Sequence, residues 1–151
     1  MPRTPQEQSL IDVMRQLESN GGTMLDHEPL SDGTQAVGQY AIKPTTAMEM
    51  LNREPSQRYP NTDDRFKMQK MLEENPELQE EIVGRISKHL LKKNEGQIDP
   101  AAMGYFKGHN RSMERNETDL QDLNLYRDRL DAAKAKNNIM PTLYNKLKEP
   151  K

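Results

Sequence analysis

The chain has 151 residues, with 24 acidic and 22 basic side chains, a formal net charge of −2 and no cysteine. Acids and bases alternate along it without a basic face, which argues against a nucleic-acid binder. The lack of cysteine excludes disulfides and cysteine-based metal sites. Hydrophobic residues make up 32%, which predicts a modest core, and no segment has the roughly 20 apolar residues that a membrane span needs. We therefore expect no membrane insertion, and the polar N-terminus does not predict a signal peptide.

The first predicted helix covers residues 4–17. Thr4 is placed to cap it, Pro5 suits the first helical position and Glu7 completes a capping box. Asn20-Gly21-Gly22 ends the helix, because glycine tolerates the left-handed conformation common there. Glu18 is therefore expected at the C-terminal edge of this helix, where the chain turns.

The next segment, residues 23–40, is interrupted by Pro29, Gly33 and Gly38, which predicts a loop with at most a small β-hairpin. Helical periodicity then returns, and we expect further helices at 45–52, 62–74, 76–93, 99–108 and 118–136. The tail after Pro141 is predicted to form one more helical turn or an arm that docks on a partner. The expected fold class is thus mainly α, with a minor β-hairpin or loop region and a helical C-terminal extension.

Three segments carry a recognisable pattern: residues 17–22 (LESNGG), 33–47 (GTQAVGQYAIKPTTA) and 101–110 (AAMGYFKGHN). Together and in this order they resemble the lytic transglycosylase family, most closely the versions carried by tailed bacteriophage particles. The resemblance covers roughly residues 8–112 and implies a lysozyme-like fold. It predicts a transglycosylase domain at 1–116, a C-terminal helix packed on it at 117–136 and a tail at 137–151.

The resemblance assigns catalysis to Glu18. Cleavage of the β-1,4 bond between MurNAc and GlcNAc needs an acid that protonates the departing oxygen. A carboxyl does this near neutral pH only if its pKa rises from about 4.3 to about 6, through burial against apolar groups. The free carbonyls at a helix C-terminus also disfavour a negative charge. The alternative is an ordinary solvated glutamate at a helix end.

A transglycosylase needs only this one carboxylate, which then accepts a proton from the C6 hydroxyl of the sugar and leaves a 1,6-anhydro product. A hydrolase would need a second carboxylate at roughly 5–9.5 Å. Asp26 and Asp32 are the nearest candidates in the sequence. Their alternative role is that of ordinary loop or turn acids.

The resemblance also predicts residues that contact the glycan strand: Ser19, His27, Thr34, Gly38, Tyr40, Ile42, Tyr105, His109 and Asn110. Ser19 has the alternative of touching backbone at the helix end, Gly38 that of a plain turn glycine and Tyr40 that of core packing. Tyr105 matches the motif tyrosine that lies over the catalytic glutamate in the family. His109 and Asn110 have the alternative of capping a helix, and His27 that of an ordinary loop residue.

The implied partners are a peptidoglycan glycan strand and other virion or tail proteins, with no cofactor. The three histidines, His27, His89 and His109, are too scattered to predict a metal site. The implied location is a virion, as a tail or internal protein that opens the cell wall during genome entry.

Two positions depart from the family pattern. Ala41 stands where the family has a glutamine that bonds the glycan, and Lys43 stands where it has a methionine before the proline. These departures leave open a second interpretation, a structural or assembly component of the virion tail that retains the fold without catalysis. The charged segment 119–136 and the proline-flanked tail also suit assembly with other chains.

Overall fold

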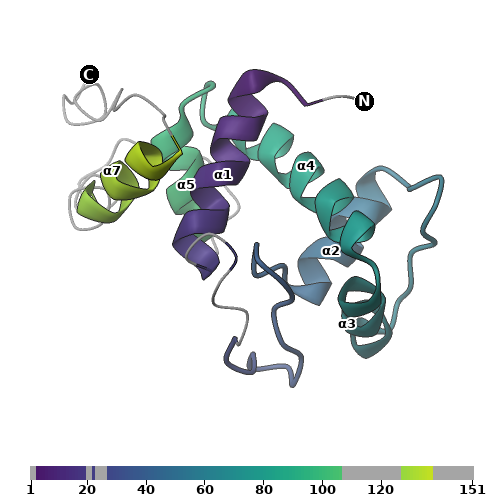
Figure 1. Ribbon diagram of the computed structural model, residues 1–151. Helices are drawn as coiled ribbons and strands as arrows, with labels where there is room; N and C mark the ends of the chain where they lie inside the picture. Colours follow the sequence, from purple (N-terminus) through teal and green to yellow (C-terminus); the bar gives the residue numbers. More distant parts are fainter. Residues whose placement is uncertain (1–2, 20–21, 23–26, 107–126, 138–151) are drawn as a thin grey trace. The chain divides into compact units, whose positions relative to one another are not determined.

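The computed structural model describes residues 3–19, 22, 27–106 and 127–137. These residues are mainly helical, as predicted (Figure 1). The helices within them are α1 (Pro5–Ser19), α2 (Pro44–Arg53), α3 (Arg65–Glu74), α4 (Pro76–Lys93), α5 (Ile98–Phe106) and α7 (Arg127–Lys136). Extended structure in the same ranges is limited to two isolated antiparallel bridges, Pro29 with Gln35 and Val37 with Ile42. The predicted small hairpin therefore consists of single bridges within a loop.

The start of α1 shows how local sequence fixes a helix. Thr4 N donates to Glu7 Oε1 at 2.8 Å, and Glu7 N donates to Thr4 Oγ1 at 3.1 Å. This reciprocal pair is the predicted capping box, which satisfies backbone donors that no helical carbonyl reaches. The prediction for this helix is confirmed, and its last residue is Ser19 rather than Leu17.

The start of α3 differs from the prediction. The helix begins at Arg65, three residues after the predicted start at residue 62, because the side chain of Asp64 accepts hydrogen bonds from Phe66 N at 3.0 Å and Lys67 N at 3.3 Å. Aspartate is a strong N-cap, and it bonds these otherwise unpaired amides. The predicted helix at 99–108 is described as far as Phe106, and the start predicted at residue 118 lies outside the described residues.

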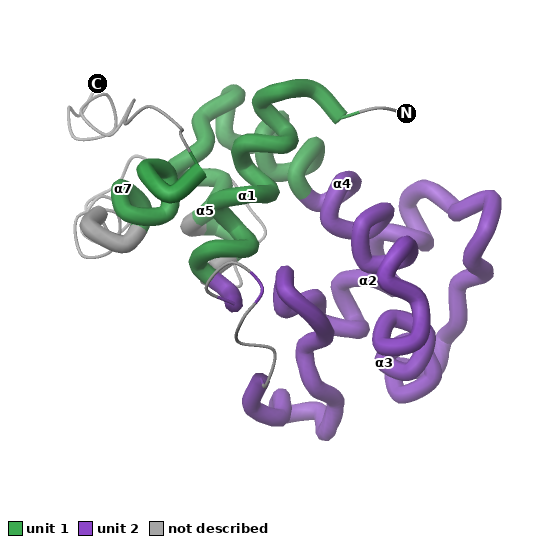
Figure 2. Tube along the Cα trace, in the orientation of Figure 1, with its two compact units in different colours: residues 1–17, 87–151 green, residues 18–86 purple. Residues whose placement is uncertain are grey.

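The chain divides into two compact units, one formed by residues 1–17 and 87–151 and the other by residues 18–86 (Figure 2). The predicted domain boundary at residue 116 lies outside the described residues. The division into 1–116, 117–136 and 137–151 therefore stays a prediction. Among the described residues, no helix is both long and apolar enough to cross a membrane.

In the first unit, α5 and α7 are joined by a buried ion pair. Lys134 Nζ lies 2.8 Å from Asp99 Oδ1 and 3.0 Å from Oδ2, and both side chains are 2% exposed. Asn137 Nδ2 donates to the carbonyl of Asp12 in α1 at 3.4 Å, which links α7 to α1 as well. The apolar core of this unit contains Leu10, Ile11, Val13, Met14, Leu17, Leu90, Leu91, Ala101, Ala102, Leu130 and Ala133.

The second unit contains α2, α3, the first part of α4 and the loop that precedes α2. Helices α2 and α3 pack against each other. The buried apolar side chains of this unit are Val37, Tyr40, Ile42, Ala47, Met50, Leu51, Met68, Leu72, Leu78, Ile82, Val83 and Ile86. The loop therefore contributes to the core, and its backbone is held in a fixed position by the helices below it.

Candidate functional site

Glu18 is the penultimate residue of α1, and its side chain is half-buried. The carboxyl stands at the C-terminal end of the helix, where free carbonyls disfavour an added negative charge. The last turn of this helix contains no basic residue. This is the position that the sequence predicted for it.

The next residue, Ser19, ties the end of α1 to the loop. Its side chain is 1% exposed, and its hydroxyl donates to the carbonyl of Gln39 at 2.6 Å while it accepts from Gly22 N at 2.9 Å. The first two motif segments, 17–22 and 33–47, are thus joined by a hydrogen bond from a buried serine. The described contacts of Ser19 are with backbone, as its alternative role requires.

The Gln39 carbonyl belongs to a tight turn between Val37 and Ile42. Val37 N donates to Ile42 O at 2.9 Å, and Ile42 N donates back to Val37 O at 3.0 Å. Inside this pair, Ala41 N donates to Gly38 O at 3.1 Å, and Ala41 has a φ of 50°. A left-handed alanine costs roughly 1–2 kcal/mol. The turn is therefore held in a strained conformation at the position where the family has glutamine.

Gly38 is constrained by a neighbouring side chain. Its φ is +77°, and a Cβ at this position would collide with the amide of Gln79 from α4. That amide is fixed by a hydrogen bond from its Nε2 to Leu72 O at 2.7 Å. The group that lies against this glycine is the Gln79 side chain, and contact of Gly38 with a glycan stays a prediction.

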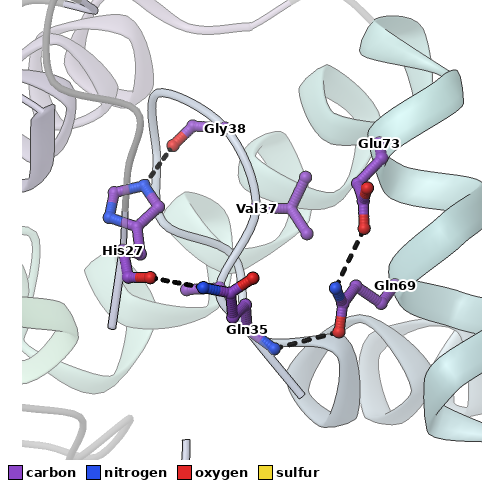
Figure 3. Close-up of a pocket in the computed structure, with 7 residues that line it drawn as sticks. His27, Gln35, Val37, Gly38, Gln69 and Glu73 are labelled. Atoms are coloured by element: carbon purple, nitrogen blue, oxygen red, sulfur yellow. Dashed lines mark hydrogen bonds between the residues drawn. The ribbon is translucent and has the colours of Figure 1, made fainter. Parts of the chain in front are cut away.

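Beside this turn lies a pocket of about 240 Å³ (Figure 3). Its two sides come from different parts of the unit: the loop supplies one wall and α3 supplies the other. The lining residues are His27, Gln35, Ala36, Val37, Gly38, Gln69 and Glu73. Gly38 thus belongs both to the pocket and to the turn that Ser19 holds.

Hydrogen bonds order the polar residues of this pocket. His27 Nε2 lies 2.8 Å from Gly38 O, and because a carbonyl only accepts, this nitrogen carries the proton. Gln35 Nε2 donates to His27 O at 2.7 Å, and Gln35 N donates to Gln69 Oε1 at 2.9 Å. Gln69 Nε2 donates in turn to Glu73 Oε1 at 2.9 Å. Figure 3 shows this chain of contacts running from the loop to α3.

Asp32 is engaged in a turn of the same loop. Its carboxylate accepts hydrogen bonds from both the hydroxyl and the backbone amide of Thr34, and Arg65 Nε lies 3.7 Å away. The pKa of Asp32 is held below its usual value, mainly by the hydrogen bond from the Thr34 hydroxyl and then by the one from the Thr34 amide. The charge of Arg65 lowers the pKa further, and slight desolvation raises it by less than these contacts lower it. Thr34 itself is fully buried. These contacts match the turn-acid role that the sequence left open for Asp32.

The remaining predicted site residues have different environments. Tyr40 is 2% exposed and Ile42 is fully buried, so both pack in the core beneath the turn. For Tyr40 this burial favours packing over sugar stacking. Tyr105 lies on α5, in the other unit, and is half-buried. Asp26, His109 and Asn110 lie outside the described residues.

Gln69, Glu73 and Gln79 were not predicted as site residues. In the sequence they are ordinary polar positions of two helices, and no local motif marks them. Only the packing of α3 and α4 against the loop brings them to the pocket and the turn. Among the described residues, no group of His, Asp or Glu side chains is placed to hold a metal ion.

Compared with known protein families, curated proteins and solved structures, the chain matches none. The likeness to lytic transglycosylases therefore depends on the three motif segments. The structure adds the contact between the first two of these segments, from Ser19 to Gln39.

Proposed function

We propose that this chain is a lytic transglycosylase of a bacteriophage particle, with a lysozyme-like fold, that cleaves peptidoglycan and opens the cell wall for genome entry. Glu18 is its single acid and base. The observation that supports this most directly is the hydrogen bond from the hydroxyl of the buried Ser19 to the Gln39 carbonyl. It joins the glutamate-serine helix end to the glycine-containing loop, which are the first two segments of the family pattern.

The proposed reaction follows from the chemistry of the bond. Glu18 donates a proton to the oxygen between MurNAc and GlcNAc as the C1–O bond breaks and positive charge develops on the sugar. The resulting carboxylate then accepts the proton of the MurNAc C6 hydroxyl, whose oxygen bonds to C1. The product is a 1,6-anhydro sugar, and the glutamate is again protonated for the next cycle.

The positions of the other groups support this division of roles. Ser19 and the Val37–Ile42 turn position the end of α1, and the ion-paired Asp32 is not needed as a second carboxylate. For Tyr105, His109 and Asn110, contact with the glycan stays a prediction from the family pattern. The enzyme needs no cofactor, and its partners are the glycan strand and other proteins of the particle.

The test is to incubate the purified chain with peptidoglycan sacculi and to identify the released sugars by mass spectrometry. The matched variants are Glu18→Gln and Glu28→Gln, the second being an exposed loop glutamate of the same unit. We expect anhydro-muropeptides from the parent and from Glu28→Gln, with a loss of at least 100-fold in Glu18→Gln. Reducing-end products would contradict the transglycosylase reaction and indicate a hydrolase.

A second function is favoured by one feature of the turn. The space next to Gly38 is taken by Gln79, and Ala41 replaces the glutamine of the family. These features suit a component of the virion tail that retains the fold without catalysis. Failure of the folded parent to release sugars from several wall types would favour this function over the first.

A further inference from the structure

The pocket between the loop and α3 has an unequal balance of charge. Glu73 is the acid among its lining residues, and this lining contains neither lysine nor arginine. Ala36 and Val37 are the apolar side chains of the lining. A ligand that enters this pocket therefore meets a carboxylate whose charge the lining itself does not neutralise.

The walls of the pocket retain acceptor positions for the donors of a ligand. His27 Nε2 and one hydrogen of each glutamine amide, Gln35 and Gln69, donate to acceptors of the pocket itself, and each amide keeps a second hydrogen. A carboxylate offers about four acceptor positions and an amide oxygen two. Glu73 Oε1 receives one hydrogen from Gln69, so the carboxylate retains capacity for further donors. In neutral His27, the proton on Nε2 leaves Nδ1 as an acceptor.

Glu73 is an exposed residue of α3, and this chain of bonds links its carboxylate to the loop. Gln69 accepts from the backbone of Gln35 through its oxygen and donates to Glu73 through its nitrogen. The orientation of the Gln69 amide is therefore set by the loop, and it holds the carboxylate on the α3 side of the pocket (Figure 3).

We propose that this pocket binds a primary ammonium group. An ammonium has three donors, no acceptor and the charge that complements Glu73. A neutral hydroxyl would supply one donor without the charge, and a carboxylate or phosphate would be repelled. The volume of about 240 Å³ suits one such group with its carbon neighbours rather than an extended ligand.

The source of the ammonium group rests on the proposed function. Peptidoglycan presents primary amines in two places, on the diamino acid of the stem peptide and on glucosamine units that lack their acetyl group. Both share the chemistry that the pocket requires. The pocket would then select the wall segment that reaches the Glu18 helix end.

The test measures binding without cleavage, by NMR titration of the full chain carrying Glu18→Gln. The probes are a disaccharide-tetrapeptide with a free diamino-acid amine, the same compound with that amine acetylated, and short glucosamine and N-acetylglucosamine oligomers. We expect shifts in the side-chain amide signals of Gln35 and Gln69 with an amine-bearing probe and at least fivefold weaker binding after acetylation. The diamino-acid and glucosamine probes distinguish the two sources.

Glu73→Gln should weaken binding of the amine about fivefold, and added salt should reduce the parent's affinity toward that of the variant. Glu74→Gln is the matched control, because Glu74 is an exposed neighbour on α3 outside the pocket lining. Equal affinity for amine and acetylated probes, or equal loss in both variants, would overturn the proposal. If the chain binds amines but the parent releases no sugars from sacculi, the catalytic function is refuted and the ammonium site is not. If the parent releases sugars but shows no preference for amines, the ammonium site is refuted and the catalytic function is not.

Discussion

Asp32 and Asp99 show how two regions of this chain hold the same side chain in opposite ways. Asp32 lies in the loop of residues 27–43, partly exposed, where the Thr34 hydroxyl and amide hold its pKa below the usual value. Asp99 lies in the first turn of α5 and is 2% exposed; burial raises its pKa, although the bond to Lys134 opposes the rise. The nearby charge of Asp131 adds to the rise.

The two aspartates differ in their exposure to water, and this determines how easily another group can replace one of their contacts. Around Asp32 the polar groups are close to water, so a ligand can replace a solvent contact at small cost. At Asp99 and Lys134 two charges are removed from water, and each depends on the other for compensation. The candidate site lies in the first kind of region, and the attachment of α7 to α5 depends on the second.

The largest expected effect comes from breaking the buried pair. Lys134→Ala should lower the free energy of unfolding of the unit that contains α5 and α7 by about 3–5 kcal/mol, because it leaves the Asp99 carboxylate buried without a partner. Denaturant unfolding followed by circular dichroism measures this. Lys136→Ala, an exposed lysine of the same helix, should change it by less than about 0.5 kcal/mol.

A double variant tests whether the loss comes from the unpaired charge. Asp99→Leu combined with Lys134→Met should unfold within about 1 kcal/mol of the parent or be more stable, since apolar packing replaces the pair. A loss in Lys134→Ala no larger than in Lys136→Ala would mean that the pair is solvated and would end the contrast between the two regions.

The pH dependence of stability should have opposite signs for the two aspartates. The lowered pKa of Asp32 contributes stability that is present above the unfolded value of about 3.9 and is lost as pH falls through the folded value. The raised pKa of Asp99 has the opposite effect: its contribution to stability increases as pH falls from the raised folded value toward 3.9.

The free energy of unfolding, measured between pH 2 and 7, should therefore decrease less steeply with falling pH in Asp32→Asn than in the parent. In Asp99→Asn it should decrease more steeply than in the parent, above pH 3.9. Parallel profiles would contradict these assignments.

The smallest effect is expected from Thr34→Val, which keeps the shape of a buried side chain and removes its hydroxyl. The pKa of Asp32 should rise toward its ordinary value, because the hydroxyl is the largest cause of its lowering. Carboxyl-detected NMR titration measures this shift. Overall stability should fall by less than in Lys134→Ala, and an unchanged pKa would show that the backbone amide and Arg65 alone hold the charge.

The helices could be predicted wherever a local signal sets their ends. Thr4 and Glu7 fix the start of α1, and Asn75-Pro76 separates α3 from α4 near the predicted residues. At α3 the start was predicted at residue 62, but the side chain of Asp64 bonds the first amides and the helix begins at Arg65. The residue at which a helix begins depends on which side chain bonds the first amides, and the spacing of apolar residues does not contain that information.

The candidate site could be predicted only in part. Glu18 at a helix end and Gly38 in a turn follow from local patterns, since glycine and capping signals act over a few residues. Gln69 and Glu73 could not be found in this way, because their position beside His27 and Gln35 depends on how α3 packs against the loop.

The sequence by itself determined the mainly helical class, the start of α1, both ends of α4 and the placement of Glu18, because hydrophobic periodicity and capping are local. Tertiary structure decided the partner of Asp99, thirty-five residues away in the chain, and the side chain that lies against Gly38. It also decided the composition of the pocket. Pairings between distant residues are selected by the burial and desolvation of whole elements, and the burial of a given side chain is set only when those elements pack.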